Sequence, residues 1–421
     1  MFTITAALVL AGPAPARPHA DSTRARQAMR EAQAYAARDA ASLWGVSLTT
    51  PLLVVDPRTR RAVSAERDSA GLMVAEGDTW SAIIPADVPI ANTSLRWGDR
   101  TWAMVLAPLP ADSVERGILL MHEVWHSVQA GVQVPLQSPD NPHLATAAGR
   151  AWLKVEGRAL DSALASTGEH RKRAMIDALA ARRARRAALP GSAATEQPLE
   201  LSEGLAEFTG ITLVAAPGER ASLVRARLSR LDTEGSLVRS FPYATGAAWA
   251  LLLDLIDDGW RTYLRPDTDL AIMAAEAMRI NPDTLDLGDA RFAPYGLREI
   301  RADEEEREVV RLARQDSLRA RYVTGPTLRL PLAEMNMSFN PNNVEPLPDA
   351  GTVYRPFRLS DRWGVLDADS SGALVNTTFS EARVATPGPG GTSGPGWKVT
   401  LKPGWVVVPA DRAGNYTIRK R

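Results

Sequence analysis

The segment His122-Glu123-Val124-Trp125-His126 constrains the fold of this chain more than any other, because its chemistry requires one particular backbone. Residues four apart share one face of an α-helix, so His122 and His126 lie side by side only if the segment is helical. The flanking sequence agrees, since Asp112 or Ser113 can cap a helix that runs to about residue 130. We therefore expect a helix that presents two imidazoles, with the Glu123 carboxylate next to them.

Two imidazoles on one helix face can bind a metal ion. The chain of 421 residues contains five His and no Cys, so a metal site must use His, carboxylate or water. His122 and His126 can bind one Zn²⁺ at about 2.0–2.1 Å, and Glu123 is placed to take a proton from a water on that metal. The alternative is a surface pair of His next to a Glu, but a chance match is rare in a chain with so few His.

A third ligand is expected from the apolar segment Leu201-Ser202-Glu203-Gly204-Leu205-Ala206-Glu207-Phe208. Glu203 and Glu207 are also four apart on a predicted helix. One carboxylate can complete a His₂Glu ligand set, and the other can orient a ligating His. The alternative is an exposed acidic helix face. The apolar neighbours argue against it, because they favour burial of the segment.

Two other residues compete for the third ligand position. Glu156 lies in an apolar helical stretch, where it is either a ligand or a buried partner of Arg158. His143 is either a ligand or an ordinary loop residue.

The two motifs together resemble the gluzincin zinc peptidases, the group of thermolysin and the aminopeptidase N relatives. The resemblance rests on His122-Glu123-x-x-His126 followed by Glu203-Gly204-x-Ala206-Glu207. It implies a zincin-like fold, with Glu203 as the third zinc ligand and Glu207 as the support of a zinc-bound His. It also implies that Glu123 is the general base in the cleavage of a peptide or protein substrate.

A third segment, Phe241-Pro242-Tyr243-Ala244-Thr245-Gly246, resembles the Tyr-x-x-Gly stretch of the aminopeptidase relatives. The resemblance implies that the Tyr243 hydroxyl stabilises the oxyanion of the reaction, a role for which a neutral donor is suited. Tyr263, Arg158 or a backbone amide are the alternatives for that role.

Two features differ from those relatives. The interval between His126 and Glu203 is much longer, so a helical hairpin of about residues 145–190 would be an insertion. No Gly-x-Met-Glu-Asn-like segment precedes the His pair, so exopeptidase specificity is not indicated.

The fold class expected is α+β. Strand signals precede the His helix at residues 52–55, 80–84, 90–97 and 101–107 and predict a small mixed sheet. The strand at 101–107, or its hairpin partner, is a candidate for pairing with an extended peptide. Helical patterns follow and end near residue 325, after which strand and turn signals dominate. We therefore expect a zincin-like catalytic domain over residues 21–325 and a small β-rich domain over residues 326–421.

Charge and hydropathy restrict the setting of the protein. The formal net charge is zero, which gives no basis for nucleic acid as a partner. Residues 2–12 are apolar and precede a small-residue stretch, which predicts a signal peptide over residues 1–20 and export to the periplasm or the outside. No other stretch is apolar for long enough to span a membrane. The Arg-rich helix at residues 169–188 is interpreted as a solvated face.

A competing hypothesis is that the chain binds zinc but catalyses no reaction. The chain would then be a catalytically inactive, zinc-stabilised binding or assembly protein of the same fold. The intact Glu123 argues against this, because a purely structural metal site has no use for a general base.

Overall fold

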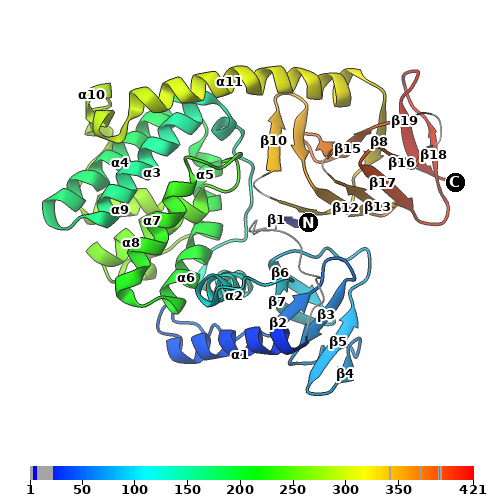
Figure 1. The fold of residues 1–421 in the computed structure, drawn as a ribbon, viewed down its shortest axis with the longest axis horizontal. Coiled ribbons are helices and arrows are strands. Elements are labelled where there is room, and N and C mark those ends of the chain that lie inside the picture. The colour runs from blue at the N-terminus through cyan, green and yellow to red at the C-terminus, as the bar shows by residue number, and fades with distance from the viewer. Residues whose placement is uncertain (1–2, 7–21, 341–342, 370, 387, 389–390) are drawn as a thin grey trace. The chain divides into compact units, whose positions relative to one another are not determined.

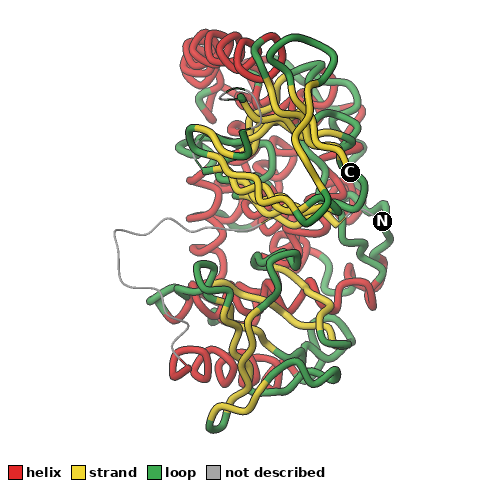
Figure 2. Tube along the Cα trace, turned by 90° about the vertical axis from the view of Figure 1, so that its right-hand side faces the viewer, coloured by secondary structure: helices red, strands yellow, loops and turns green. Residues whose placement is uncertain are grey.

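The computed structural model describes residues 3–6, 22–340, 343–369, 371–386, 388 and 391–421. These residues form two compact units: the first comprises residues 22–84 and 92–304, and the second comprises residues 3–6, 85–91 and 305–421. Strands occur in both units, whereas most helices belong to the first (Figure 1 and Figure 2). The α+β class and the β-rich C-terminal region expected from the sequence are therefore confirmed.

A six-stranded mixed sheet opens the first unit. Its order is β4 (Val74–Glu76), β5 (Thr79–Ile83), β3 (Arg61–Ser64), β2 (Leu52–Val55), β7 (Arg100–Leu106) and β6 (Thr93–Trp97). Strands β2 and β7 are parallel, and the other neighbours are antiparallel. Because β7 is paired on both sides, the expectation that it could accept a peptide does not hold. Its hairpin partner β6 lies at the sheet edge.

The helix that carries the His pair is α2 (Ser113–Val128). Of the two predicted caps the structure has Asp112, whose side chain accepts hydrogen bonds from the amides of Val114 and Glu115. Residues 117–126 are buried, since α2 packs against β6 and β7 as well as against α6 (Leu205–Val214) and α1 (Ser22–Asp39). The face of α2 that carries His122 and His126 is thus held inside the unit.

Helices make up the remainder of the first unit. They are α3 (Ala147–Ala165), α4 (Gly168–Ala188), α5 (Ala193–Leu199), α6, α7 (Pro217–Arg230), α8 (Pro242–Ile256), α9 (Leu270–Ala277) and α10 (Asp289–Phe292). Short 3₁₀ turns join them at η1 (Gln129–Val132), η2 (Pro142–Ala145), η4 (Trp260–Tyr263), η5 (Pro282–Thr284) and η6 (Ala293–Tyr295). A π-helical turn, η3 (Glu200–Gly204), connects α5 directly to α6.

Helix α4 corrects one expectation from the sequence. Its Arg182 and Arg185 are 2% and 0% exposed, so the interpretation as a solvated face is wrong for these two arginines, whereas Arg173 on the same helix is exposed. Both guanidinium groups lie against carboxylates from other helices, which the charge pattern of α4 alone does not reveal.

The second unit contains two sheets. One has the order β1 (Thr3–Ala6), β9 (Asn336–Phe339), β12 (Phe357–Asp361), β13 (Gly364–Ala368), β17 (Trp397–Leu401) and β16 (Ser393–Gly394). The other has the order β10 (Val344–Leu347), β11 (Gly351–Tyr354), β14 (Ala373–Val375), β15 (Glu381–Ala385), β8 (Thr327–Pro331), β19 (Tyr416–Lys420) and β18 (Trp405–Pro409).

Helix α11 (Leu297–Arg319) belongs to both units, because the division falls between residues 304 and 305. The boundary predicted at residues 325–326 lies after this helix and its terminal π turn, η7 (Ala320–Thr324). The β-rich region therefore shares its compact unit with the second part of α11.

The predicted signal peptide, residues 1–20, lies largely outside the described residues. Its described part, Thr3–Ala6, forms β1 and pairs in parallel with β9. None of the described helices is long and apolar enough to cross a membrane.

Candidate metal centre

Three buried side chains from two segments converge on one point. His122 and His126 extend from α2, and Glu203 extends from the π turn η3. The Nε2 atoms of the two His are 3.2 Å apart. Glu203 Oε2 lies 3.3 Å from His122 Nε2 and 3.6 Å from His126 Nε2. The three side chains are at most 9% exposed.

These distances fit a metal ion. A tetrahedral zinc site with bonds of 2.0–2.1 Å has ligand-to-ligand distances of about 3.3–3.4 Å. The three measured distances among His122, His126 and Glu203 bracket that value, and all three donor atoms lie within 4.8 Å of one another. Imidazole nitrogen and carboxylate oxygen suit several divalent metals, so the donor set admits zinc without being specific to it.

The electrostatics of the site require positive charge beside its carboxylates. Burial alone would lower the pKa of His122, but hydrogen bonds with Glu203 and Glu207 raise it to about 10. Burial likewise opposes the charged form of Glu203, yet the charges of His126 and His122 hold the pKa of this carboxyl well below its usual value. Buried carboxylates of this kind need positive charge beside them, which imidazolium protons or a metal ion can supply.

Glu123 differs from the other carboxylates of the centre. It is 2% exposed, and its Oε2 atom has no hydrogen-bond partner among the described residues. Burial raises the pKa of Glu123 to about 7, against the opposing charges of His122 and His126. A buried carboxylate oxygen without a protein partner is costly, and this one belongs to the residue that follows His122 in the chain.

A chain of ionic contacts supports His122. Its Nδ1 atom lies 3.3 Å from Oε2 of Glu207, which leaves Nε2 free to face the metal position. Arg227 on α7 donates to Glu207 at 2.7 Å and to Glu115 at 2.6 and 2.9 Å. Burial would raise the pKa of Glu207, but the charge of Arg227 and the hydrogen bond with His122 lower it to about 2.

The partner of His126 was not found from the sequence. His126 Nδ1 lies 2.7 Å from Oε1 of Gln129, a residue at the end of α2 that is 1% exposed. The Gln129 amide nitrogen in turn donates to the Val134 carbonyl. A Gln at the end of a helix is ordinary, and only its spacing of three residues from His126 could have suggested this role.

Tyr243 lies at the edge of the centre, in the first turn of α8. Its hydroxyl donates a hydrogen bond of 2.7 Å to Oε2 of Glu203, and its ring stacks on His122 with centroids 5.5 Å apart. Burial and the neighbouring Glu203 raise the pKa of Tyr243 well above its usual value, so the phenol stays neutral. The structure thus brings Tyr243 together with the predicted ligands.

Close backbone packing sets the distance between the two ligand-bearing segments. Gly210 on α6 faces α2, and a Cβ atom there would lie 2.6 Å from the Ile118 carbonyl oxygen. Only glycine permits this approach, so α6 and the π turn before it lie near enough to α2 for Glu203 and Glu207 to reach the His side chains.

The rival residues lie in other contacts. Glu156 is fully buried and is bound by Arg182, Arg185 and the Trp249 indole, not by Arg158. His143 Nε2 lies 2.8 Å from Glu196. Arg158 donates to Asp232 and to the Tyr295 carbonyl. Tyr263 is 64% exposed.

No family model, curated protein or solved structure matches this chain. The chemistry of the centre is therefore inferred from its own residues.

Proposed function

We propose that this chain is a zinc-dependent peptidase of the gluzincin type, with a zincin-like first unit. The observation that carries the proposal is that the His122, His126 and Glu203 donor atoms lie within 4.8 Å of one another, while the buried Glu123 Oε2 atom has no partner among the described residues. Three protein ligands leave a fourth position for water or substrate, which is typical of catalytic zinc sites, whereas structural sites are usually closed by four ligands.

Zinc bound by these residues would supply Lewis-acid activation of a water and of the scissile carbonyl. Glu123 then accepts the proton of the attacking water and passes it to the leaving nitrogen. The Oε2 atom of Glu123 has no competing hydrogen bond among the described residues, so it is available for both transfers. The Tyr243 hydroxyl, now donating to Glu203, is a neutral donor for the carbonyl oxygen as it gains charge.

The substrate in this proposal is an extended peptide or protein segment. Strand β6 lies at the edge of its sheet and packs against α2, the helix of the His pair. An added strand on that edge would satisfy its backbone groups and run past the metal helix. Export of the protein, expected from the apolar N-terminal residues, belongs to the same proposal.

The alternative is an inactive, zinc-stabilised binding or assembly protein. It shares the ligands but leaves Glu123 without a purpose. A buried carboxylate oxygen with no hydrogen-bond partner destabilises a fold, and a structural site would gain from a neutral side chain at this position. The peptidase proposal accounts for Glu123, and the alternative does not.

The test is hydrolysis of casein by the full chain, with and without a zinc chelator, together with Glu123→Gln. We expect about one zinc per chain, activity that the chelator removes, and a Glu123→Gln protein that keeps zinc but loses about 10²–10⁴-fold in activity. Glu276→Gln, on the exposed side of α9, is the matched control and should behave as wild type. Zinc-loaded protein that cleaves no peptide would instead favour the inactive alternative.

A further inference from the structure

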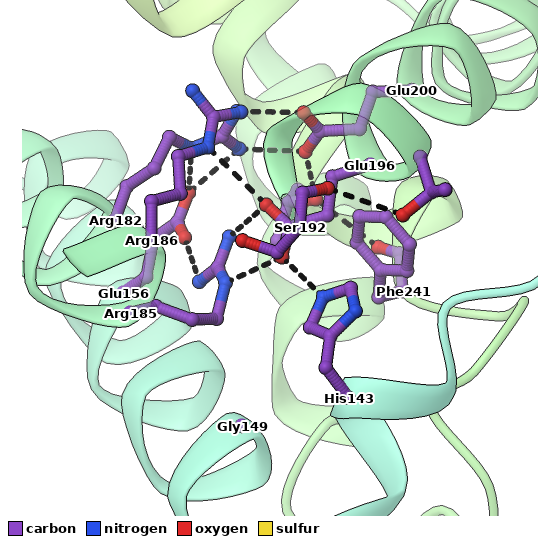
Figure 3. Close-up of polar contacts among 12 residues, drawn as sticks. His143, Gly149, Glu156, Arg182, Arg185, Arg186, Ser192, Glu196, Glu200 and Phe241 are labelled. Carbon is purple, nitrogen blue, oxygen red and sulfur yellow. Dashed lines mark hydrogen bonds and ion pairs between the residues drawn. The ribbon is translucent and has the colours of Figure 1, made fainter. Parts of the chain in front are cut away.

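The π turn η3 carries two carboxylates that serve different partners. Glu203 faces the His pair, whereas Glu200, three residues earlier, faces away into a second buried cluster. Glu200 is 2% exposed and receives two parallel hydrogen bonds from Arg182, at 2.6 and 2.7 Å (Figure 3). Paired contacts of this kind fix orientation as well as distance.

Glu200 also binds helix α8, which carries Tyr243. The Thr245 hydroxyl donates to Oε1 of Glu200, and Thr245 is two residues beyond Tyr243. The same carboxylate therefore joins α4, through Arg182, to the two segments that carry Glu203 and Tyr243.

The backbones of these two segments touch. A Cβ atom at Gly204 would lie 2.6 Å from the Gly246 Cα, and a Cβ at Gly246 would lie 3.1 Å from the Glu200 carbonyl oxygen. Three contacts thus join η3 to α8: the Glu200–Thr245 hydrogen bond, the Gly204–Gly246 approach and the Tyr243–Glu203 hydrogen bond. The last belongs to the metal centre, and the first two determine where it can form.

Arg182 is itself held on several sides. It contacts Glu156 on α3 at 2.7–2.8 Å, and Glu156 accepts further hydrogen bonds from Arg185 and from the Trp249 indole on α8. Arg185 in turn binds Glu196 (Figure 3). The hairpin of α3 and α4 is therefore tied to the segments next to the metal centre by buried charges.

Stability alone is a weak reason for such a cluster, because apolar residues of similar volume often stabilise a core equally well. Directional contacts instead specify one geometry. Here they fix the position of η3 relative to α8. The Tyr243 hydroxyl on α8 donates to Glu203 Oε2 on η3 at 2.7 Å.

We propose that Arg182, Glu200 and Thr245, named here the Glu200 clamp, are positioning residues that set the geometry of Glu203 and Tyr243 in the metal centre. The proposal rests on the proposed function. The clamp touches neither metal nor substrate and acts through the two residues that do.

The decisive variant is Thr245→Val, which keeps the shape of the side chain and removes the hydroxyl. Zinc affinity should fall by about 10–100-fold, as for other residues that orient metal ligands. The visible spectrum of the Co²⁺-substituted protein should change, because it reports ligand geometry. In casein hydrolysis, kcat should fall by about 10–100-fold with KM little altered, because Thr245 does not contact substrate.

Two variants serve as controls. Thr245→Ser restores the hydroxyl and should return the Co²⁺ spectrum, zinc affinity and kcat toward wild type. Thr212→Val makes the same chemical change at a buried threonine near the C-terminal end of α6. The Thr212 hydroxyl has no hydrogen-bond partner among the described residues. This variant should leave all three measurements unchanged.

The proposal is overturned if Thr245→Val matches Thr212→Val in spectrum, zinc affinity and kcat. If Thr245→Val does not fold, Glu200→Gln is measured in the same way, and an unaltered Co²⁺ spectrum there overturns the proposal. Wild-type protein that binds zinc but cleaves no peptide refutes the proposed function alone, since the two metal measurements still decide the clamp. Wild-type protein that binds no metal refutes both.

Discussion

Two buried ionic regions lie within the first unit and satisfy their charges in different ways. In the cluster of Figure 3, named here the closed cluster, both oxygens of Glu156 and both oxygens of Glu196 accept hydrogen bonds from arginines. Its carboxylates are therefore neutralised within the chain, although Arg186 Nη2 and Ser192 Oγ have no partner among the described residues. In the metal centre, no arginine contacts Glu203, and one oxygen of Glu123 has no partner among the described residues. The difference separates carboxylates that arginines neutralise from a set in which imidazolium protons of the His pair or a bound cation supply the positive charge.

The comparison is tested most strongly by removing one carboxylate from each region. Glu203→Ala should lower zinc affinity sharply, because it deletes a ligand. Glu156→Ala should leave zinc bound but lower the free energy of unfolding by about 3–5 kcal/mol, because it removes a buried carboxylate that neutralises Arg182 and Arg185. Zinc titration and urea unfolding of both variants give the answer. The reverse pattern would make Glu156 the ligand.

A smaller effect is expected from Tyr243→Phe, which touches the metal centre without removing a ligand. Zinc content, folding and substrate binding should stay nearly unchanged, while kcat falls by about 10²–10³-fold through loss of an oxyanion donor. Steady-state kinetics on a defined peptide provide the measurement. An unchanged kcat would mean that Tyr243 only supports Glu203. A backbone amide would then be the candidate for the oxyanion donor.

The smallest effect concerns the response of the closed cluster to acid. Burial would raise the pKa of Glu196, but the charge of Arg185 and the hydrogen bond with His143 hold it well below its usual value. A carboxyl with a depressed pKa stabilises the fold above its unfolded value of about 4.3, and this contribution is lost as the pH falls through the folded value.

The free energy of unfolding of wild type should therefore decline below about pH 4.3, and Glu196→Gln should show a shallower decline. Urea unfolding on both sides of that pH checks the slope. Glu276→Gln removes an exposed carboxylate and should keep the wild-type slope. Equal slopes in wild type and Glu196→Gln would show that Glu196 does not carry this dependence.

The metal centre could be predicted from the sequence largely because its information is local. His122 and His126 are four residues apart on one capped helix, and Glu203 and Glu207 repeat that spacing in an apolar segment. The structure brings three of these donor atoms within bonding range of one point. Gln129 was missed because a glutamine at a helix end is common.

The closed cluster could not be predicted in the same way. Arg182 and Arg185 stand in a helix with many arginines, and their partners Glu156, Glu196 and Glu200 come from three other segments. Nothing in the spacing of like charges on one helix tells which of them are buried. Strands β3 and β9 were also not predicted, because each has only four residues and carries a weak local pattern.

The π turn η3 has a consequence for how this arrangement of carboxylates could change during evolution. In an unbroken α-helix, Glu200, Glu203 and Glu207 would share one face, since they are three and four residues apart. The wider turn rotates Glu200 away from Glu203, so neighbouring carboxylates enter different ionic regions. A regular α-helical turn in its place would change the direction in which Glu200 and Glu203 face relative to each other. A related chain with that change would keep His122, His126 and Glu203 in its sequence, so a motif search would not detect the altered arrangement.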